Sequence, residues 1–187
     1  MIHITEWVEF LKKREFDKNK LYNRSLLDHL IATYQLGVKL DCSIEVCLAG
    51  LFHSIYGRNK AYKFNGIALS NRQEIISLIG KSTENLVYLF WNSEYNGSLK
   101  LNLAKRDNFS ITLYDNSVLH LDTPTASSLI NLSAINLLEQ VIYALKNSLA
   151  PKQELLTYIA PYKEAKMLLS PRAYEELIIY TSICSNL

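Results

Sequence analysis

The chain has 187 residues, of which 49% are hydrophobic, and its 20 basic and 18 acidic side chains leave a net charge of +2. This length suits one domain with a substantial core, while the scattered Lys and Arg residues argue against a nucleic-acid polymer as partner. The longest apolar runs are far shorter than the ~20 residues of a membrane-spanning helix, which argues against a membrane partner. We therefore expect a single soluble domain over residues 1–187 and a cytoplasmic location.

The three cysteines, Cys42, Cys47 and Cys184, form no C-x-x-C pair. An odd number without such a pair predicts neither a disulfide framework nor a cysteine zinc site. We expect all three to be small buried hydrophobic side chains.

Two helices are predicted before residue 41. Thr5 precedes the amphipathic run EWVEFLKKREF and is typical of a helix cap, and this first helix is expected to pack as a lid. Asn23 or Ser25 can cap the next helix, LLDHLIATYQLGVKL, which has His29 on the edge of its apolar face. His29 is therefore expected in the core or at its border.

The central element is the apolar segment Ser43 to Gly57, SIEVCLAGLFHSIYG. Ser43 is expected to begin this helix and Gly57 to end it. Almost no polar face remains, so the helix is predicted to be buried on most sides, and His53 then needs a hydrogen-bond partner. The polar and aromatic loop at residues 58–69 has the composition of a segment that can cover a pocket.

The second half of the chain continues the helical pattern. Ser70 and Gln73 predict a capping box for a helix that stops at Gly80. Irregular sequence at 95–108 predicts an excursion, and ITLYDNSVLHL predicts a hairpin with a two-residue turn at Asp115 and Asn116. Further helices are expected at residues 82–94, 123–146, 151–169 and 171–183. The predicted fold class is an all-α bundle with one small β-hairpin.

His29 and His53 are 24 residues apart, on two apolar helices joined by a short turn. Antiparallel packing of this helical hairpin brings the two rings close together. Two neutral imidazoles suit a first-row transition metal such as Mn, Fe or Zn, although a hydrolytic site also needs carboxylates that fix geometry and bridge ions. The alternative is a pair of buried histidines that hydrogen-bond their neighbours and stabilise the hairpin.

Several motifs resemble the HD superfamily of metal-dependent phosphohydrolases. LLDHLIATYQL is similar to its first histidine motif, and CLAGLFHSIYG to the helix that carries its His-Asp pair. RQEIISLIGKSTENLVYLFWNSE and SSLINLSAINLLEQ are similar to later segments of stringent-response (p)ppGpp hydrolase domains. A group of uncharacterised HD-like domains shares the LFHSIYG ending. The resemblance covers Leu26 to Gln140 and implies an HD-like core at about 24–146, with C-terminal helices at 151–184.

The resemblance also implies a divalent metal and a small phosphorylated or nucleotide-like substrate, yet the acidic residues of the family are replaced. Ser54 stands where the His-Asp pair has its aspartate, and the Glu-Asp pair of the (p)ppGpp hydrolases aligns near Gly57 and Arg58. Serine is a poor ligand for a divalent metal and cannot orient a hydroxide as a carboxylate does. In place of the distal aspartate, the later helix offers Asn131, Ser133 and Asn136 before Glu139.

Other candidate site residues each have a simpler alternative. Arg72 and Glu84 match the Arg and Glu pattern of the uncharacterised group and could bind a ligand, or they could form a solvated ion pair on a helix surface. His120 could add a third imidazole, but an edge-strand histidine that faces solvent is expected. Asp28 is expected on the surface. Tyr56, with Tyr62 and Phe64, could stack on a ring.

Three hypotheses remain from the sequence. The first is a catalytically degenerate HD-like domain that binds a small ligand or acts as a regulatory or interaction module. The second is an active HD-type hydrolase in which Glu139, Glu84 or Asn136 takes over a ligand role. The third is a metal-independent acid/base enzyme in small-molecule biosynthesis, with His53 as base and Ser54 and Tyr56 as hydrogen-bond partners.

Overall fold

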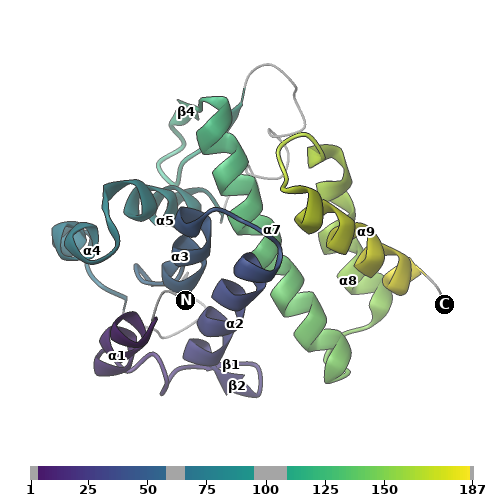
Figure 1. The fold of residues 1–187 in the computed structure, drawn as a ribbon, viewed down its shortest axis with the longest axis horizontal. Coiled ribbons are helices and arrows are strands. Elements are labelled where there is room, and N and C mark those ends of the chain that lie inside the picture. Colours follow the sequence, from purple (N-terminus) through teal and green to yellow (C-terminus); the bar gives the residue numbers. More distant parts are fainter. Residues whose placement is uncertain (1–3, 58–65, 95–108, 186–187) are drawn as a thin grey trace.

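A computed structural model describes residues 4–57, 66–94 and 109–185. Helices dominate this part of the chain, and two short two-stranded sheets accompany them, as expected for an all-α fold with a small hairpin (Figure 1). The α-helices are α1 Thr5–Lys13, α2 Leu26–Lys39, α3 Ile44–Phe52, α4 Arg72–Ile79, α5 Lys81–Glu94, α7 Thr123–Lys146, α8 Lys152–Ile159 and α9 Pro171–Ser185. The 3-10 helices are η1 Leu69–Asn71 and η2 Ala160–Ala165, and the strands are β1 Lys20–Leu21, β2 Arg24–Ser25, β3 Ser110–Thr112 and β4 Val118–His120.

The helical hairpin of α2 and α3 is defined by its caps and by two glycines. Ser25 caps α2 in a reciprocal box with Asp28, and Ser43 caps α3 by accepting a hydrogen bond from the Val46 N–H. A Cβ atom at Gly37 would lie 3.1 Å from the Cys47 sulfur, and one at Gly50 would lie 3.1 Å from Cγ2 of Thr33. The absence of these methyl groups lets the two helices approach closely, which brings their polar side chains together.

Helix α7 runs through the middle of the fold (Figure 1). It contacts α2, α3 and α5, and also α8 and α9. Its length and apolar composition would suffice to cross a membrane, but 67% of its most apolar window is buried within the protein. This burial is typical of the core helix of a soluble protein.

Polar residues on α7 attach the C-terminal helices. The Asn131 amide donates to the Leu168 carbonyl at 2.8 Å and accepts from the Ser170 N–H at 2.9 Å. The hydroxyls of Ser133 and Tyr162 share a hydrogen bond. Asn131 and Ser133, two of the residues that align near the distal acid, therefore bind the C-terminal part of the chain.

Some predicted helix boundaries are wrong. Thr5 is the first residue of α1 and not its cap, and no side chain caps this helix, which ends at Lys13. Helix α3 ends at Phe52, so that His53 lies at its C-cap and the segment up to Gly57 forms turns.

Later boundaries also differ from the predictions. The expected box of Ser70 and Gln73 does not form, because η1 precedes α4 and Asn71 occupies the cap position without a side-chain bond. The helix predicted over 151–169 ends as an α-helix at Ile159, because a proline interior to a helix removes a hydrogen bond and Pro161 follows two residues later.

The predicted hairpin forms between β3 and β4, with Ser110 opposite His120. Its loop has three residues and not two, since the Leu113 N–H donates to Ser117 O across Tyr114, Asp115 and Asn116. The small sheet of β1 and β2 was not predicted. The expected pocket-covering part of 58–69 falls largely, and the excursion at 95–108 entirely, outside the described residues.

Candidate functional site: a buried histidine pair with an arginine and a glutamate

The two histidines lie together, as the helical hairpin predicts. His29 extends from α2 and His53 from the C-cap of α3, and their Nε2 atoms are 3.3 Å apart. The rings meet edge to face with centroids 5.1 Å apart, and the Phe90 ring of α5 also meets the His53 ring edge to face, with centroids 5.7 Å apart. Both side chains are buried.

The second nitrogen of each ring is also engaged. Nδ1 of His29 lies 2.5 Å from Oε2 of Glu139 on α7, and Nδ1 of His53 lies 2.8 Å from the Gly50 carbonyl oxygen. Carbonyl and carboxylate oxygens accept hydrogen bonds, so both Nδ1 atoms donate. This arrangement fixes the orientation of both rings and turns their Nε2 atoms toward each other.

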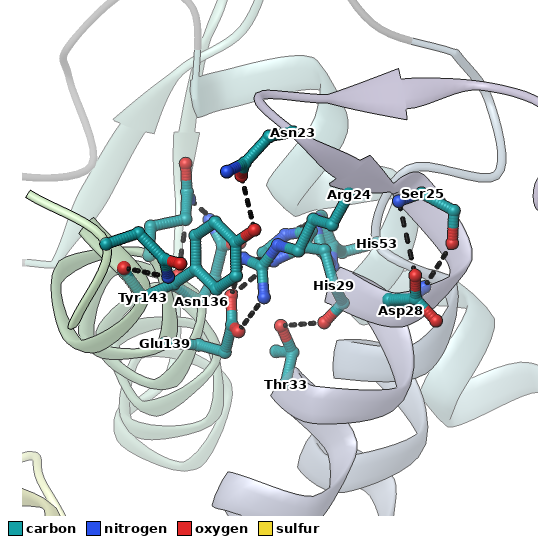
Figure 2. A network of polar contacts seen from close by, with 12 residues as sticks. Asn23, Arg24, Ser25, Asp28, His29, Thr33, His53, Asn136, Glu139 and Tyr143 are labelled. Carbon is teal, nitrogen blue, oxygen red and sulfur yellow. Dashed lines mark hydrogen bonds and ion pairs between the residues drawn. The ribbon is translucent and has the colours of Figure 1, made fainter. Parts of the chain in front are cut away.

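Arg24 completes the cluster from β2 (Figure 2). Its Nη1 and Nη2 atoms contact the two Glu139 oxygens at 2.5 and 2.6 Å, and Nη2 lies 3.3 Å from Nδ1 of His29. The guanidinium stacks on the Tyr143 ring at 3.7 Å, and the Tyr143 hydroxyl donates to the Asn23 side chain. Only 10% of the Arg24 side chain is exposed.

One donor in this cluster has no acceptor. Within the part of the chain that the structure describes, no atom accepts from the buried Nε of Arg24. A buried N–H without a partner is uncommon in proteins and costs free energy, so it is a site where a ligand or water would gain a hydrogen bond.

The carboxylate of Glu139 remains ionised in this environment. Burial acts to raise its pKa, but the hydrogen bonds and positive charges of His29 and Arg24 outweigh burial and lower the pKa. The ionised carboxylate of Glu139 is thus hydrogen-bonded to Arg24 and His29.

A second ion pair, between Arg72 and Glu84, contacts the turn after α3 through Tyr56. Glu84 of α5 is only 1% exposed, and it accepts two hydrogen bonds of 2.7 Å from Arg72 and one of 2.5 Å from the Tyr56 hydroxyl. Arg72 stacks on the Tyr88 ring at 3.8 Å. Burial and the contact with Glu84 raise the pKa of Tyr56. The alternative of a solvated surface ion pair is wrong, since Glu84 is buried.

The remaining candidates are placed less centrally. Ser54 is buried in the turn after α3, and Asn136 accepts hydrogen bonds from Gln140. His120 lies on exposed β4, as expected. Asp28 is exposed, as expected, and its side chain closes the capping box of α2.

The donor set does not fit the metal centre that the HD resemblance implies. Both Nε2 atoms could lie about 2.1 Å from one ion, given their separation. Further donors are needed to hold it, and across residues 4–57, 66–94 and 109–185 no group of three His, Cys, Asp or Glu side chains is arranged to do so. Glu139 contacts the Nδ1 side of His29, away from the paired Nε2 atoms.

Arg24 and Tyr143 are members of the site that the sequence analysis missed. In the sequence, Arg24 lies between two candidate helix caps, Asn23 and Ser25, and this pattern indicates only a turn. Tyr143 is one of twelve tyrosines. Neither belongs to a motif, and the small sheet that places Arg24 over α7 is only two residues per strand.

Comparisons with known proteins give one partial match. The sequence pattern of a family described as "Domain of unknown function (DUF6817)" matches residues 10–93. This segment begins within α1 and stops one residue before the end of α5, so it includes both histidines, Arg24, Arg72 and Glu84, but not α7 with Glu139. No curated protein and no solved structure matches the chain.

Proposed function

We propose that this protein is a catalytically degenerate HD-like domain that binds a small phosphorylated ligand at the cluster of Arg24, His29, His53 and Glu139. The unpaired Nε–H of buried Arg24 is the observation that supports binding at this place. Arginine is well suited to phosphate, because its planar guanidinium stays charged and offers several donors in a fixed geometry.

Arg24 and Glu139 offset each other's charge, so the cluster has no net negative charge that would repel an anion. Arg24 contributes one positive charge and Glu139 one negative charge, and the two imidazoles beside them add positive charge whenever they bind a proton. The β1 and β2 turn carries Arg24 and the exposed Asn23, so the cluster adjoins the surface on this side (Figure 2). A phosphate that approaches there would meet the guanidinium first.

A binding role is favoured over hydrolysis by the positions of the carboxylates. Glu139 is bound by Arg24 and His29, and Glu84 by Arg72 and Tyr56. A hydrolytic HD centre needs carboxylates that coordinate metal and activate water, and Ser54 cannot supply this chemistry.

The proposal is tested with inorganic phosphate, pyrophosphate and a nucleoside diphosphate as probes, by calorimetry and thermal unfolding of the full chain. At least one probe is expected to raise the Tm of the wild type, and Arg24→Gln should remove this shift. Arg24→Lys keeps the charge but not the planar donors, so it should weaken binding. Arg172→Gln, at an exposed arginine, is the matched control and should bind as the wild type.

Two results would overturn the proposal. One is that none of the three probes binds, or that binding is equally strong in wild type and Arg24→Gln. The other is release of phosphate from a phosphorylated probe with added Mn²⁺ that His53→Ala abolishes while the protein stays folded. The second result would establish the active hydrolase instead.

A further inference from the structure

Two of the three cysteines lie together at the turn between α2 and α3. Ser43 is the N-cap of α3, so Cys42 immediately precedes the cap and Cys47 is the fourth residue of the helix. Side chains at these two positions often pack against each other across a helix cap, and they are usually apolar. Here both positions hold a thiol, and the Cys47 sulfur lies 3.6 Å from the Cys42 carbonyl oxygen.

Neighbouring elements hold the two thiols in place. Cys47 is buried, and a Cβ atom at Gly37 of α2 would lie 3.1 Å from its sulfur. The Cys42 N–H donates to the Gly37 carbonyl at 3.0 Å, and the Cys42 sulfur lies 4.0 Å from Oδ1 of Asn131 on α7. This Asn131 oxygen also accepts from the Ser170 N–H, so it keeps a hydrogen bond if the Cys42 thiol turns away.

The two thiols differ in their access to solvent. Cys42 is half-buried, whereas Cys47 is fully enclosed, and so is the third cysteine, Cys184 on α9. Burial raises the pKa of the Cys42 thiol to about 11 and that of the Cys47 thiol to about 12. Because the thiolate is the reactive form, both thiols exchange slowly at neutral pH. A slow rate leaves the equilibrium unchanged, and the equilibrium depends on how the fold holds the two sulfurs.

We propose that Cys42 and Cys47 form a reversible disulfide by exchange with a small-molecule disulfide such as oxidised glutathione. The Cys42 thiolate attacks one glutathione sulfur, the glutathione S–S bond breaks, and one glutathione thiolate leaves. The Cys47 thiolate then attacks the Cys42 sulfur of this mixed disulfide and displaces the second glutathione. Two protein thiols are oxidised, one glutathione disulfide is reduced, and the two thiol protons end on the two departing glutathiones.

The bond would fasten the helical hairpin at its turn. His29 lies in the first turn of α2 and His53 at the C-cap of α3, so the histidine pair occupies the opposite end of the same hairpin. In a reducing compartment such bonds are usually transient and report a change in redox conditions. The disulfide does not depend on the proposed phosphate ligand.

The proposal is tested on the folded full chain, which is equilibrated at mildly alkaline pH with mixtures of reduced and oxidised glutathione. An acid quench, alkylation in urea and mass spectrometry then count the thiols that remain. The reduced chain should be alkylated at three cysteines and the oxidised chain only at Cys184. Glu45 lies between the two other cysteines, so cleavage after Glu45 should give two peptides that stay joined until a reductant is added.

Two variants and an unfolded sample are the controls. Cys184→Ala should form the bond as the wild type does, and Cys47→Ala should stop at a mixed disulfide of Cys42 with glutathione. The folded wild type should become half oxidised at a lower fraction of oxidised glutathione than the same chain in urea, because the fold holds the two sulfurs together. If Cys47→Ala does not fold, the peptide map of the wild type still decides.

Three results would overturn the proposal. One is that all three cysteines of the folded chain remain thiols in every glutathione mixture. Another is a disulfide that joins Cys42 or Cys47 to Cys184 or to a second chain. The last is oxidation that is easier in the urea-unfolded chain than in the folded one, since the fold would then oppose the bond.

Discussion

Arg24 and Glu139 are 115 residues apart in the sequence, and their side chains form a two-point ion pair over the end of the α2 and α3 hairpin. The pair joins β2, which lies immediately before α2, to the central helix α7. It also places a carboxylate against His29. The N-terminal segment, the histidine pair and the central helix are thus connected through one carboxylate.

Replacement of this carboxylate should be costly. Glu139→Gln leaves the Arg24 guanidinium buried without its counter-charge, and breaking a buried pair by removal of one partner costs roughly 3–5 kcal/mol. Urea unfolding at pH 7 measures the change. Asp41→Asn, which removes the exposed partner of Arg172, is the matched control and should change stability by less than about 1 kcal/mol. Equal effects of the two substitutions would contradict a structural role of the buried pair.

Acid should weaken the contacts of the Glu139 carboxylate with Arg24 and His29. The pKa of Glu139 is lowered from its ordinary value of 4.5, so its contribution is fully present above pH 4.5 and is lost as pH falls through the lowered value. The wild type is therefore expected to lose stability more steeply than Glu139→Gln when urea unfolding is compared at pH 5, 4 and 3. Parallel curves for the two proteins would show that Glu139 has the same pKa in both states.

The approach of the two histidines was predictable because it depends on local signals. Two apolar helices with a short turn and caps at Ser25 and Ser43 place His29 against His53. Their partner Glu139 was named from its position on the later helix, but its role was not predictable, since it depends on the rotation of α7 about its axis.

Contacts made by short or irregular segments were not predictable. Arg24 is placed by a sheet of two residues per strand, and such a sheet has no periodicity for a sequence pattern to display. The burial of Glu84 was missed for a related reason. A Glu and an Arg at helix-compatible positions usually form an exposed pair, and only the packing of α5 against the turn after α3 puts Glu84 in the interior.

The hydroxyl of Tyr56 should contribute measurably to the second ion pair. Tyr56→Phe removes the hydrogen bond to Glu84 but leaves both bonds from Arg72, so a loss of about 1–3 kcal/mol is expected for a buried charged acceptor. Thermal or urea unfolding measures it. Tyr158→Phe removes a longer 3.3 Å bond to Glu154 at the surface and should have little effect. If the two variants are equally stable, the Tyr56 hydroxyl is not a structural donor.

Gly50 should resist substitution because of the close contact between α2 and α3. A Cβ atom at this position would lie 3.1 Å from Cγ2 of Thr33 and 3.3 Å from Cδ1 of Ile135. Gly50→Ala raises helix propensity, but overpacking of this kind costs about 1–3 kcal/mol of stability. The Gly50 carbonyl, which accepts the hydrogen bond from His53, would also shift with the backbone.

The substitution Thr33→Ser, combined with Gly50→Ala in a double variant, tests whether the contact between the new Cβ atom and Cγ2 of Thr33 causes this loss of stability. Serine lacks Cγ2 but keeps a hydroxyl that can donate to the His29 carbonyl, as Thr33 does at 2.9 Å. The double variant should therefore lose less stability than the sum of the two single variants, and a double-mutant cycle by urea unfolding measures the difference. Strict additivity would mean that Gly50→Ala acts elsewhere. Rescue would show that the missing methyl group at Gly50 sets the spacing at which the two imidazoles meet.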